Sequence, residues 1–405
     1  MMGFVSFVRS SGAWRPAAAR VLVRQGFGLA DRMRRVTPTE EHLRAVAGWL
    51  MRAQDATVDG GISWGYTLRR GWMPSYPETT GYIVPTLLAL GDRLGDAELE
   101  ARAERAIRFL YRLQLESGAF PGARVDENLT EPSVFNTGQI VNGLVAWHRR
   151  SGDQEALDRA LRAGDWLIGV QDDDGAWRRH IHNGLAVTYT AHASSWLAAL
   201  GRHAGSDRHL AAAVRHAEWV LTRQDNESGW FDDAGFTAAD HRARRSVTHT
   251  IVYVLAGLLA TAEAAERDDI RAAVVRGARP MAARLTDSGW LPGILDARWE
   301  GRAGYACLTG TAQAALVWYR LAETTAAPEL LEPARAAVEL VAAAQRPTDR
   351  DPGVRGGIAG SDPIWGAYLG FTYPNWAAKF YADALLAAER AQGRAGNSGE
   401  PDRRS

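Results

Sequence analysis

Polar and apolar positions follow helical spacing through most of this chain. In the stretch Ala101–Leu110, for example, charged residues fall on one face of a helix and apolar residues on the other. Strand-like alternation is scarce. We predict six amphipathic helices with one charged face at 38–54, 96–115, 154–171, 207–224, 268–286 and 328–345.

A turn motif follows these helices. The segments Gln171–Trp177 (QDDDGAW) and Gln224–Trp230 (QDNESGW) share Gln, Asp, Gly and Trp, and 114–120 and 286–290 are weaker relatives. Successive Gln residues from Gln54 onward are 60, 57 and 53 residues apart. Regular recurrence at this period is the signature of a repeat protein.

A second series marks the starts of helices that are apolar nearly all round. A Thr followed seven residues later by Leu recurs at Thr80, Thr137, Thr190, Thr248 and Thr309. The separations are 57, 53, 58 and 61 residues, and a divergent sixth copy begins at 373. These Thr side chains could serve as helix N-caps.

The repeating unit is therefore an outer helix, a Gly/Trp turn and an inner helix. Six such hairpins close into a ring, because no hairpin can bury its apolar face alone. We predict an all-α (α/α)6 toroid at 37–391, a basic amphipathic segment at 1–36 and a disordered tail at 392–405.

The composition narrows the function. The 405 residues carry 47 basic and 47 acidic side chains, so the net charge is +0 and a dedicated nucleic-acid binder is not expected. A single cysteine excludes a disulfide framework and a Cys-rich zinc site. No stretch of 18 uninterrupted apolar residues predicts a membrane span. We expect a cytoplasmic protein, with membrane-surface contact through 1–36 as an alternative.

The turns at 171–177 and 224–230 resemble the repeat motif of squalene cyclases and protein prenyltransferase β-subunits. The six-hairpin count resembles the (α/α)6 barrels of glycosidases, polysaccharide lyases and sugar epimerases. The resemblance covers most of the chain. It implies the fold more firmly than a function, because this fold hosts many chemistries.

The first turns of the inner helices and the loops before them should meet at one mouth of the ring. Helix N-termini there offer free N–H groups to a polar ligand. The candidate catalytic residues are Glu78, His192, His249, Asp232 and Tyr189. The candidate substrate-binding residues are Tyr76, Tyr82, Asn136, Gln139, Trp177, Arg179, Trp230, Trp290, Tyr305, Trp365, Tyr373, Asn375, Trp376 and Lys379, the only lysine.

Carbohydrate chemistry suits these residues, because aromatic rings stack on sugars and polar groups bind hydroxyls. A glycosidase needs two carboxylates, for which Glu78 with Asp232, Asp233, Asp296 or Asp362 are candidates. A uronate lyase or epimerase needs a base, an acid and groups that bind a carboxylate. The basic turn around Arg179 favours an acidic glycan.

Two alternatives stay open. A terpene-cyclase-like or prenyltransferase-like enzyme would need a non-standard acid, such as Glu78 or Asp232, because no Asp-x-Asp-Asp motif is present. A non-catalytic glycan-binding or lipid-binding protein is the other. We expect neither a metal nor an organic cofactor, since neither a P-loop nor a dinucleotide fingerprint occurs.

Overall fold

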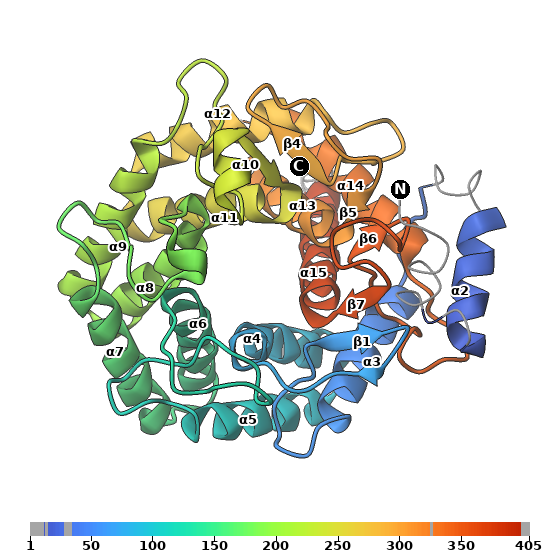
Figure 1. Cartoon of the computed structure of the whole chain (residues 1–405), viewed down its shortest axis with the longest axis horizontal. Helices are drawn as coiled ribbons and strands as arrows, with labels where there is room; N and C mark the ends of the chain where they lie inside the picture. Colours follow the sequence, from blue (N-terminus) through green and yellow to red (C-terminus); the bar gives the residue numbers. More distant parts are fainter. Residues whose placement is uncertain (1–11, 13–14, 28–34, 325–326, 398–405) are drawn as a thin grey trace, which may run out of the picture.

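The protein is a ring of paired helices, seen in a computed structural model that describes residues 12, 15–27, 35–324 and 327–397 (Figure 1). Within these residues, six hairpins each pair an outer helix with an inner one. The outer helices are α3 (Glu40–Asp55), α5 (Ala97–Tyr111), α7 (Gln154–Gly169), α9 (Asp207–Leu221), α12 (Asp268–Ala282) and α14 (Leu331–Ala344). The inner helices are α4 (Pro77–Leu94), α6 (Val134–Ser151), α8 (Ala191–Ala204), α11 (Thr248–Ala265), α13 (Leu308–Thr324) and α15 (Asn375–Asn397). The predicted (α/α)6 toroid is confirmed.

Burial explains why the inner helices are apolar nearly all round. Helix α11 is long and apolar enough to cross a membrane by length and composition, but 72% of that window is buried inside the ring. Outer helices such as α5 bury only one face, formed by Leu99, Ala103, Ile107 and Leu110. The charged outer faces therefore meet water, and the apolar sides of both helix layers form the core.

The turn glutamines join each hairpin to the next. The Nε2 of Gln54 donates to Gly60 O in its own turn at 2.9 Å and to Arg102 O of the next outer helix at 3.0 Å. Gln114, Gln171 and Gln224 repeat this pair of bonds. Gln345 closes the ring, because its Nε2 reaches Gly356 O and His42 O of the first outer helix. We call this arrangement the glutamine clamp.

The fifth turn has Leu285 and Thr286 where the other turns have the glutamine. Arg35, from the segment before the ring, bridges this joint instead. Its Nη1 donates to Asp287 O in the turn at 3.2 Å, and its Nε and Nη2 pair with Glu339 and Glu332 of α14 at 2.5 and 2.9 Å. An arginine from outside the repeats therefore supplies the contact that a glutamine supplies elsewhere.

Short strands lie in the loops on the side of the ring where the inner helices begin. Strand β1 (Gly65–Thr67) pairs antiparallel with β2 (Gly71–Trp72) and with β7 (Thr372–Pro374), which joins the first hairpin to the last. Two further pairs join β3 (Arg245–Val247) to β4 (Ile294–Asp296) and β5 (Ala306–Cys307) to β6 (Ser361–Asp362). A short helix, α10 (Ala238–Arg242), precedes β3. These loops surround the front mouth of the ring.

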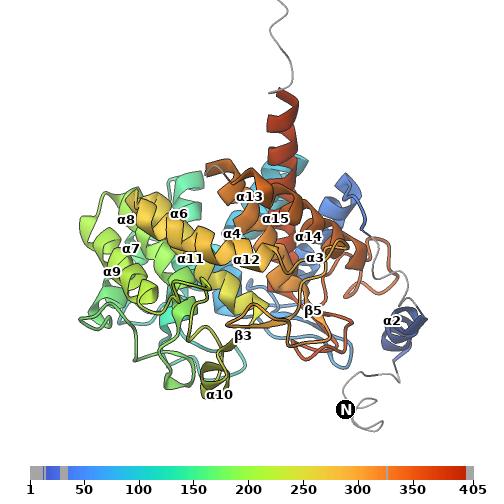
Figure 2. The same cartoon turned by 90° about the horizontal axis from the view of Figure 1, so that it is seen from above.

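The ends of the chain differ from the sequence prediction in part. Helix α2 (Pro16–Phe27) packs against the outside of the ring, with Ala18 and Val21 buried and Val23 exposed. Most of the predicted membrane-surface segment 1–36 lies outside the described residues, so membrane contact stays a prediction. Helix α15 continues to Asn397 and extends beyond the ring on the side opposite β3, β5 and α10 (Figure 2), so 392–397 are helical rather than disordered. Residues 398–405 lie outside the described part.

Candidate active site

A large cavity opens at the front mouth, where the inner helices begin. Its volume is about 1150 Å³, and its walls come from the first turns of α4, α6, α11 and α15 and from the loops before them. The polar and aromatic lining residues include Tyr76, Glu78, Tyr82, Asn136, His180, His182, Tyr189, His249, Tyr253, Tyr305, Tyr368 and Trp376. The predicted location at this mouth agrees with the cavity.

Glu78 is the carboxyl group held deepest in protein at this mouth, with only 8% of its surface exposed. Burial raises its pKa from 4.5 to about 7, although a hydrogen bond from the Tyr76 hydroxyl acts to lower it. Asn136 orients that hydroxyl, because its Nδ2 donates to Tyr76 Oη at 3.4 Å and to Pro121 O at 3.1 Å. Glu78 is therefore a carboxylic acid that keeps its proton up to near-neutral pH.

Phenol groups surround this acid. Tyr82 and Tyr253 are hydrogen-bonded to each other, and burial raises the pKa of both well above 10. Burial likewise raises the pKa of Tyr189 and Tyr368, with the nearby Glu78 charge acting in the same direction. These hydroxyls stay neutral, so they offer hydrogen bonds and apolar ring faces rather than charge.

His249 lies on the first turn of α11 in the wall of the same cavity. Burial lowers its pKa to about 4, although a hydrogen bond to Gln313 Oε1 at 2.7 Å acts to raise it. The ring donates its Nδ1 proton to that oxygen, which leaves Nε2 as an acceptor. A neutral imidazole of this kind accepts a hydrogen bond, and it is a weak proton acceptor at neutral pH.

Three more carboxylates line the cavity closer to solvent. Glu127 pairs with Arg124 at 2.5 Å, whereas Glu131 is exposed and has no ion pair within the part of the chain that the structure describes. Asp240 accepts hydrogen bonds from Thr237 at 2.6 Å and Arg245 at 2.9 Å. Partial burial would raise the pKa of Asp240, but these two bonds outweigh it and lower the pKa below its ordinary value.

The structure brings eight of the sequence-predicted residues together in this lining. They are Glu78, His249, Tyr189, Tyr76, Tyr82, Asn136, Tyr305 and Trp376. Trp376 stacks on Trp64 at a centroid distance of 6.0 Å, and its Nε1 donates to Tyr368 Oη at 3.0 Å. Each of the eight lies within or just before an inner helix.

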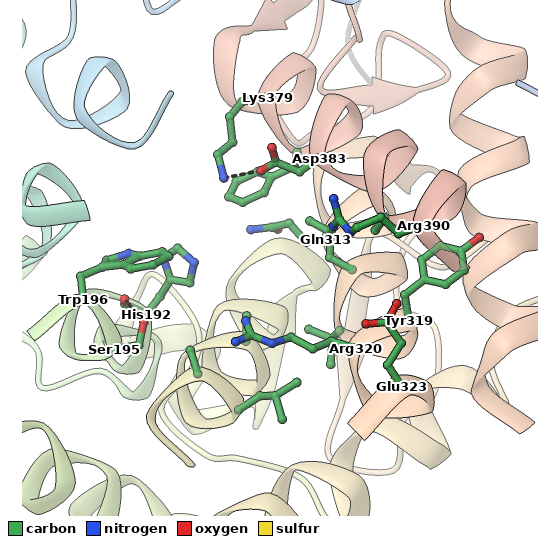
Figure 3. Close-up of a pocket in the computed structure, with 17 residues that line it drawn as sticks. His192, Ser195, Trp196, Gln313, Tyr319, Arg320, Glu323, Lys379, Asp383 and Arg390 are labelled. Carbon is green, nitrogen blue, oxygen red and sulfur yellow. Dashed lines mark hydrogen bonds and ion pairs between the residues drawn. The ribbon is translucent and has the colours of Figure 1, made fainter. Parts of the chain in front are cut away.

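Four predicted residues lie elsewhere because their partners hold them there. Asp232 sits in a separate surface depression, where Arg244 Nε pairs with its Oδ1 at 2.8 Å. Gln139 is fully buried between His192 and Trp196. His192 and Lys379 line a second cavity at the back of the ring (Figure 3). The assignment of these four to the front site is corrected.

The remaining predicted residues serve the framework or the outer surface. Trp177 and Trp230 are 1% exposed and pack inside their turns, and Asn375 joins the last hairpin to Ser63 O and Thr79 Oγ1. Tyr373 is buried in β7 opposite Tyr66. Arg179, Trp290 and Trp365 also lie outside the cavity lining. The prediction of substrate contact is corrected for the buried residues Trp177, Trp230, Tyr373 and Asn375, and it stays a prediction for Arg179, Trp290 and Trp365.

Several lining residues escaped sequence reasoning: Glu127, Asn128, Glu131, Phe135, Phe236, Asp240, Tyr253 and Tyr368. Tyr253 carried a usable signal, because it lies three residues after Thr250 and hence one helical turn deeper on the same face. The loop residues carried none, since the connections do not repeat.

Metal and thiol chemistry find no support among the described residues. They contain no group of three or more His, Cys, Asp or Glu side chains that could hold a metal ion. Cys307 is fully buried, and burial raises the pKa of its thiol to about 12. The thiol therefore stays protonated at neutral pH.

Comparison with solved structures places the ring in a known architecture. An unsaturated glucuronyl hydrolase specific for heparin aligns with a TM-score of 0.69 and 13% identity, covering 87% of this chain and 97% of that one. A second such hydrolase, from Bacillus sp. GL1, gives 0.68 and 17%, with the same coverage. The cellobiose 2-epimerase from Bacillus thermoamylovorans B4167 gives 0.70 and 14%, again covering 87% and 97%. At these identities the likeness establishes the fold.

The sequence itself identifies the family. Residues 77–294, more than half of the chain, match the family described as β-L-arabinofuranosidase, GH127 catalytic domain. No curated protein matches the sequence. The matched range includes Glu78, His249 and Asp240, and the tyrosines Tyr82, Tyr189 and Tyr253. The chain therefore belongs to the GH127 β-L-arabinofuranosidase family and is a carbohydrate-active enzyme of the six-hairpin type.

Proposed function

We propose that this enzyme hydrolyses a glycosidic bond of an oligosaccharide in the front cavity, with Glu78 as the general acid. The observation that carries the proposal is a buried carboxyl group in the wall of the front cavity, 8% exposed, where burial raises the pKa to about 7. A leaving-group oxygen needs a proton as its bond to the sugar breaks, and an acid with a pKa near the working pH supplies it best.

Asp240 is proposed as the second carboxyl group of the reaction. Its pKa is lowered where that of Glu78 is raised, so the pair consists of one acid and one carboxylate over the pH range between them. Two carboxyl groups whose surroundings separate their pKa values in this way can take the two roles of a glycosidase. Asp240 then either attacks the anomeric carbon or activates water.

The lining limits the charge of the substrate. Among the described lining residues the basic groups are the imidazoles of His180, His182 and His249, and neither Arg nor Lys is present. Glu127, Glu131 and Asp240 face the same space. We propose a short oligosaccharide with one acidic sugar, whose carboxylate lies beside His180 and His182, since several carboxylates would meet repulsion at this mouth.

The test is hydrolysis by the purified full chain of aryl and alkyl β-L-arabinofuranosides and of an unsaturated glucuronyl disaccharide. Glu78→Gln should lower kcat/KM by about 10²–10⁴ on alkyl glycosides. It should lower it far less on nitrophenyl glycosides, whose leaving group departs without a proton. Asp240→Asn should impair both. Glu104→Gln, an exposed acid on α5, is the matched control.

Three results would overturn the assignment. Equal losses on alkyl and aryl substrates would remove the acid role from Glu78. New ultraviolet absorbance during turnover of a uronate would indicate elimination instead of hydrolysis. Full activity of Asp240→Asn would exclude the second carboxyl group proposed here, and Glu131→Gln would then be the variant to measure.

A further inference from the structure

A second cavity opens at the back of the ring, between the later turns of α8, α11, α13 and α15 (Figure 3). Its volume is about 350 Å³, at the lower end of the 300–1,000 Å³ range of small-molecule sites. Trp196, Leu259, Leu316, Val317 and Tyr319 form much of its wall. The space suits a ligand of monosaccharide size.

An aromatic layer separates this back cavity from the front one. Tyr82 and Tyr253 line the front cavity, whereas His192 and Phe380 line the back one. Phe380 stacks on Tyr82 at a centroid distance of 5.8 Å, and His192 packs on Tyr253 at 4.3 Å. The two cavities therefore meet at this layer and are distinct spaces.

One buried hydrogen-bond donor in the back cavity has no acceptor among the described residues, and a second donor lies close to it. Gln313 is 3% exposed, and its Oε1 accepts a hydrogen bond from His249. The Nε2 of the same amide has no partner among the described residues. The indole of Trp196 can only donate, so it fixes Gln139 Oε1 as an acceptor at 3.0 Å, and Gln139 Nε2 then donates to His192 Nδ1 at 2.7 Å. His192 must carry its proton on Nε2, as a further donor.

The charges in the lining favour an anion. Lys379 pairs with Asp383 at 2.7 Å and lies over the Phe380 ring, with Nζ 4.2 Å from its centroid. Arg320 pairs with Glu263, and Glu323 pairs with Arg394 at 3.5 Å. Arg390 lines the same cavity and has no carboxylate partner in the described part of the chain. The lining thus carries three cations and two carboxylates, with one cation unpaired.

We propose that the back cavity is a second binding site, for a small hydroxylated organic anion of monosaccharide size such as a sugar acid. Arg390 binds its carboxylate, and the Gln313 amide, His192, Lys379 and Asp383 bind its hydroxyl groups. Trp196 packs against its apolar face. This site is independent of the reaction proposed for the front cavity.

The experiment is calorimetric titration of the full chain with D-glucuronate, and with D-glucose as the neutral probe. Glucuronate should bind, and glucose should bind at least tenfold more weakly, because the anion gains a charge-assisted hydrogen bond. Arg390→Ala should weaken glucuronate binding about tenfold or more. Ala260→Phe, which fills the cavity from α11, should abolish it. Arg108→Ala, an exposed arginine on α5, is the matched control.

Glu78→Gln distinguishes binding in the front cavity from binding in the back cavity. The substitution should change the affinity of a glucuronate bound at the front and leave the affinity of one bound at the back unchanged. The proposal is overturned if glucuronate does not bind at 10 mM, if glucose binds as tightly, or if Glu78→Gln alone weakens binding. Arg390 is exposed, so its variant should fold, and circular dichroism verifies this for every protein used. Binding heats do not require turnover, so failure of the hydrolase proposal leaves this test intact.

Discussion

The two ends of the ring are both lined by inner helices, of which α11 and α15 contribute to each, but their charged side chains differ. The front cavity, at the N-terminal ends, holds four carboxyl groups and a set of phenols. The back cavity holds three cations, Lys379, Arg320 and Arg390, and two carboxylates, Glu323 and Asp383. The difference shows that one scaffold can present two kinds of site.

Glu78 shows which effect dominates at the front. It lies in the first turn of α4, where the helix dipole stabilises a negative charge by roughly 0.3–1 kcal/mol, and up to about 2 in favourable geometries. The rise of its pKa from 4.5 to about 7 corresponds to roughly 3 kcal/mol in the other direction. Burial among aromatic rings therefore outweighs the dipole and keeps the acid protonated.

The largest effect on stability is expected at the back. Lys379→Met should destabilise the protein by about 3–5 kcal/mol, because it leaves Asp383 without its cation in a mostly buried position. Among the contacts of the described residues, the hydrogen bond from Thr86 to Asp383 at 2.8 Å would remain. Chemical unfolding measures the loss, and Lys379→Met/Asp383→Leu should recover most of it. A loss under 1 kcal/mol in the single variant would mean that water solvates Asp383 in the back cavity. The ion pair would then not be a buried feature that distinguishes the back of the ring from the front.

The second-largest effect is the pH dependence of stability that Glu78 causes in the front cavity. The pKa of Glu78 is higher in the folded state than in the unfolded chain, so its stabilising contribution is present below pH 4.5 and is lost as the pH rises through about 7. Relative to Glu78→Gln, the wild type should lose roughly 3 kcal/mol between pH 4.5 and 8. Unfolding free energies across this range measure it. A difference between the two proteins that is independent of pH would place Glu78 in contact with water.

The smallest effect is expected at Gln313, which lines the back cavity and is hydrogen-bonded to His249 in the front cavity. Gln313→Leu removes both the bond to His249 and the unpartnered donor at the back, so stability should change by less than about 1 kcal/mol. Turnover at the front should fall several-fold because the His249 ring is no longer held. Gln313→Glu should restore an acceptor for His249 and raise the pKa of its imidazole, visible by NMR titration. Unchanged turnover in both variants would show that the ends act separately.

The repeat allowed the fold to be predicted, because the turn glutamines and the Thr series recur with the period of a helical hairpin and six hairpins can close into a ring. Tyr82 and His192 both follow their Thr by two residues, yet one faces the front and the other the back. The direction in which each side chain points depends on its neighbours, as His192 depends on its hydrogen bond with Gln139. The position of a residue within the repeat does not reveal these neighbours.

Other parts of the site were beyond sequence reasoning. Asp240 and Tyr368 lie in connections that do not repeat, and the chain reveals no register that would bring them together. The excess of tryptophan misled for a physical reason, because Trp177 and Trp230 fill turns instead of contacting ligand. Asp232 had the right residue type, but Arg244 holds it at the outer surface.

The bridge made by Arg35 gives the ring a joint of a different physical kind. Four joints between successive hairpins and the closing joint at His42 depend on amide-to-carbonyl bonds, which added salt hardly weakens. The joint to α14 depends on ion pairs with Glu332 and Glu339, which ionic strength screens where they are exposed. Raising the salt concentration should therefore speed hydrogen exchange in α14 before it does so elsewhere. The local stability of the ring would then depend on ionic strength at this one joint more than at the joints held by glutamine.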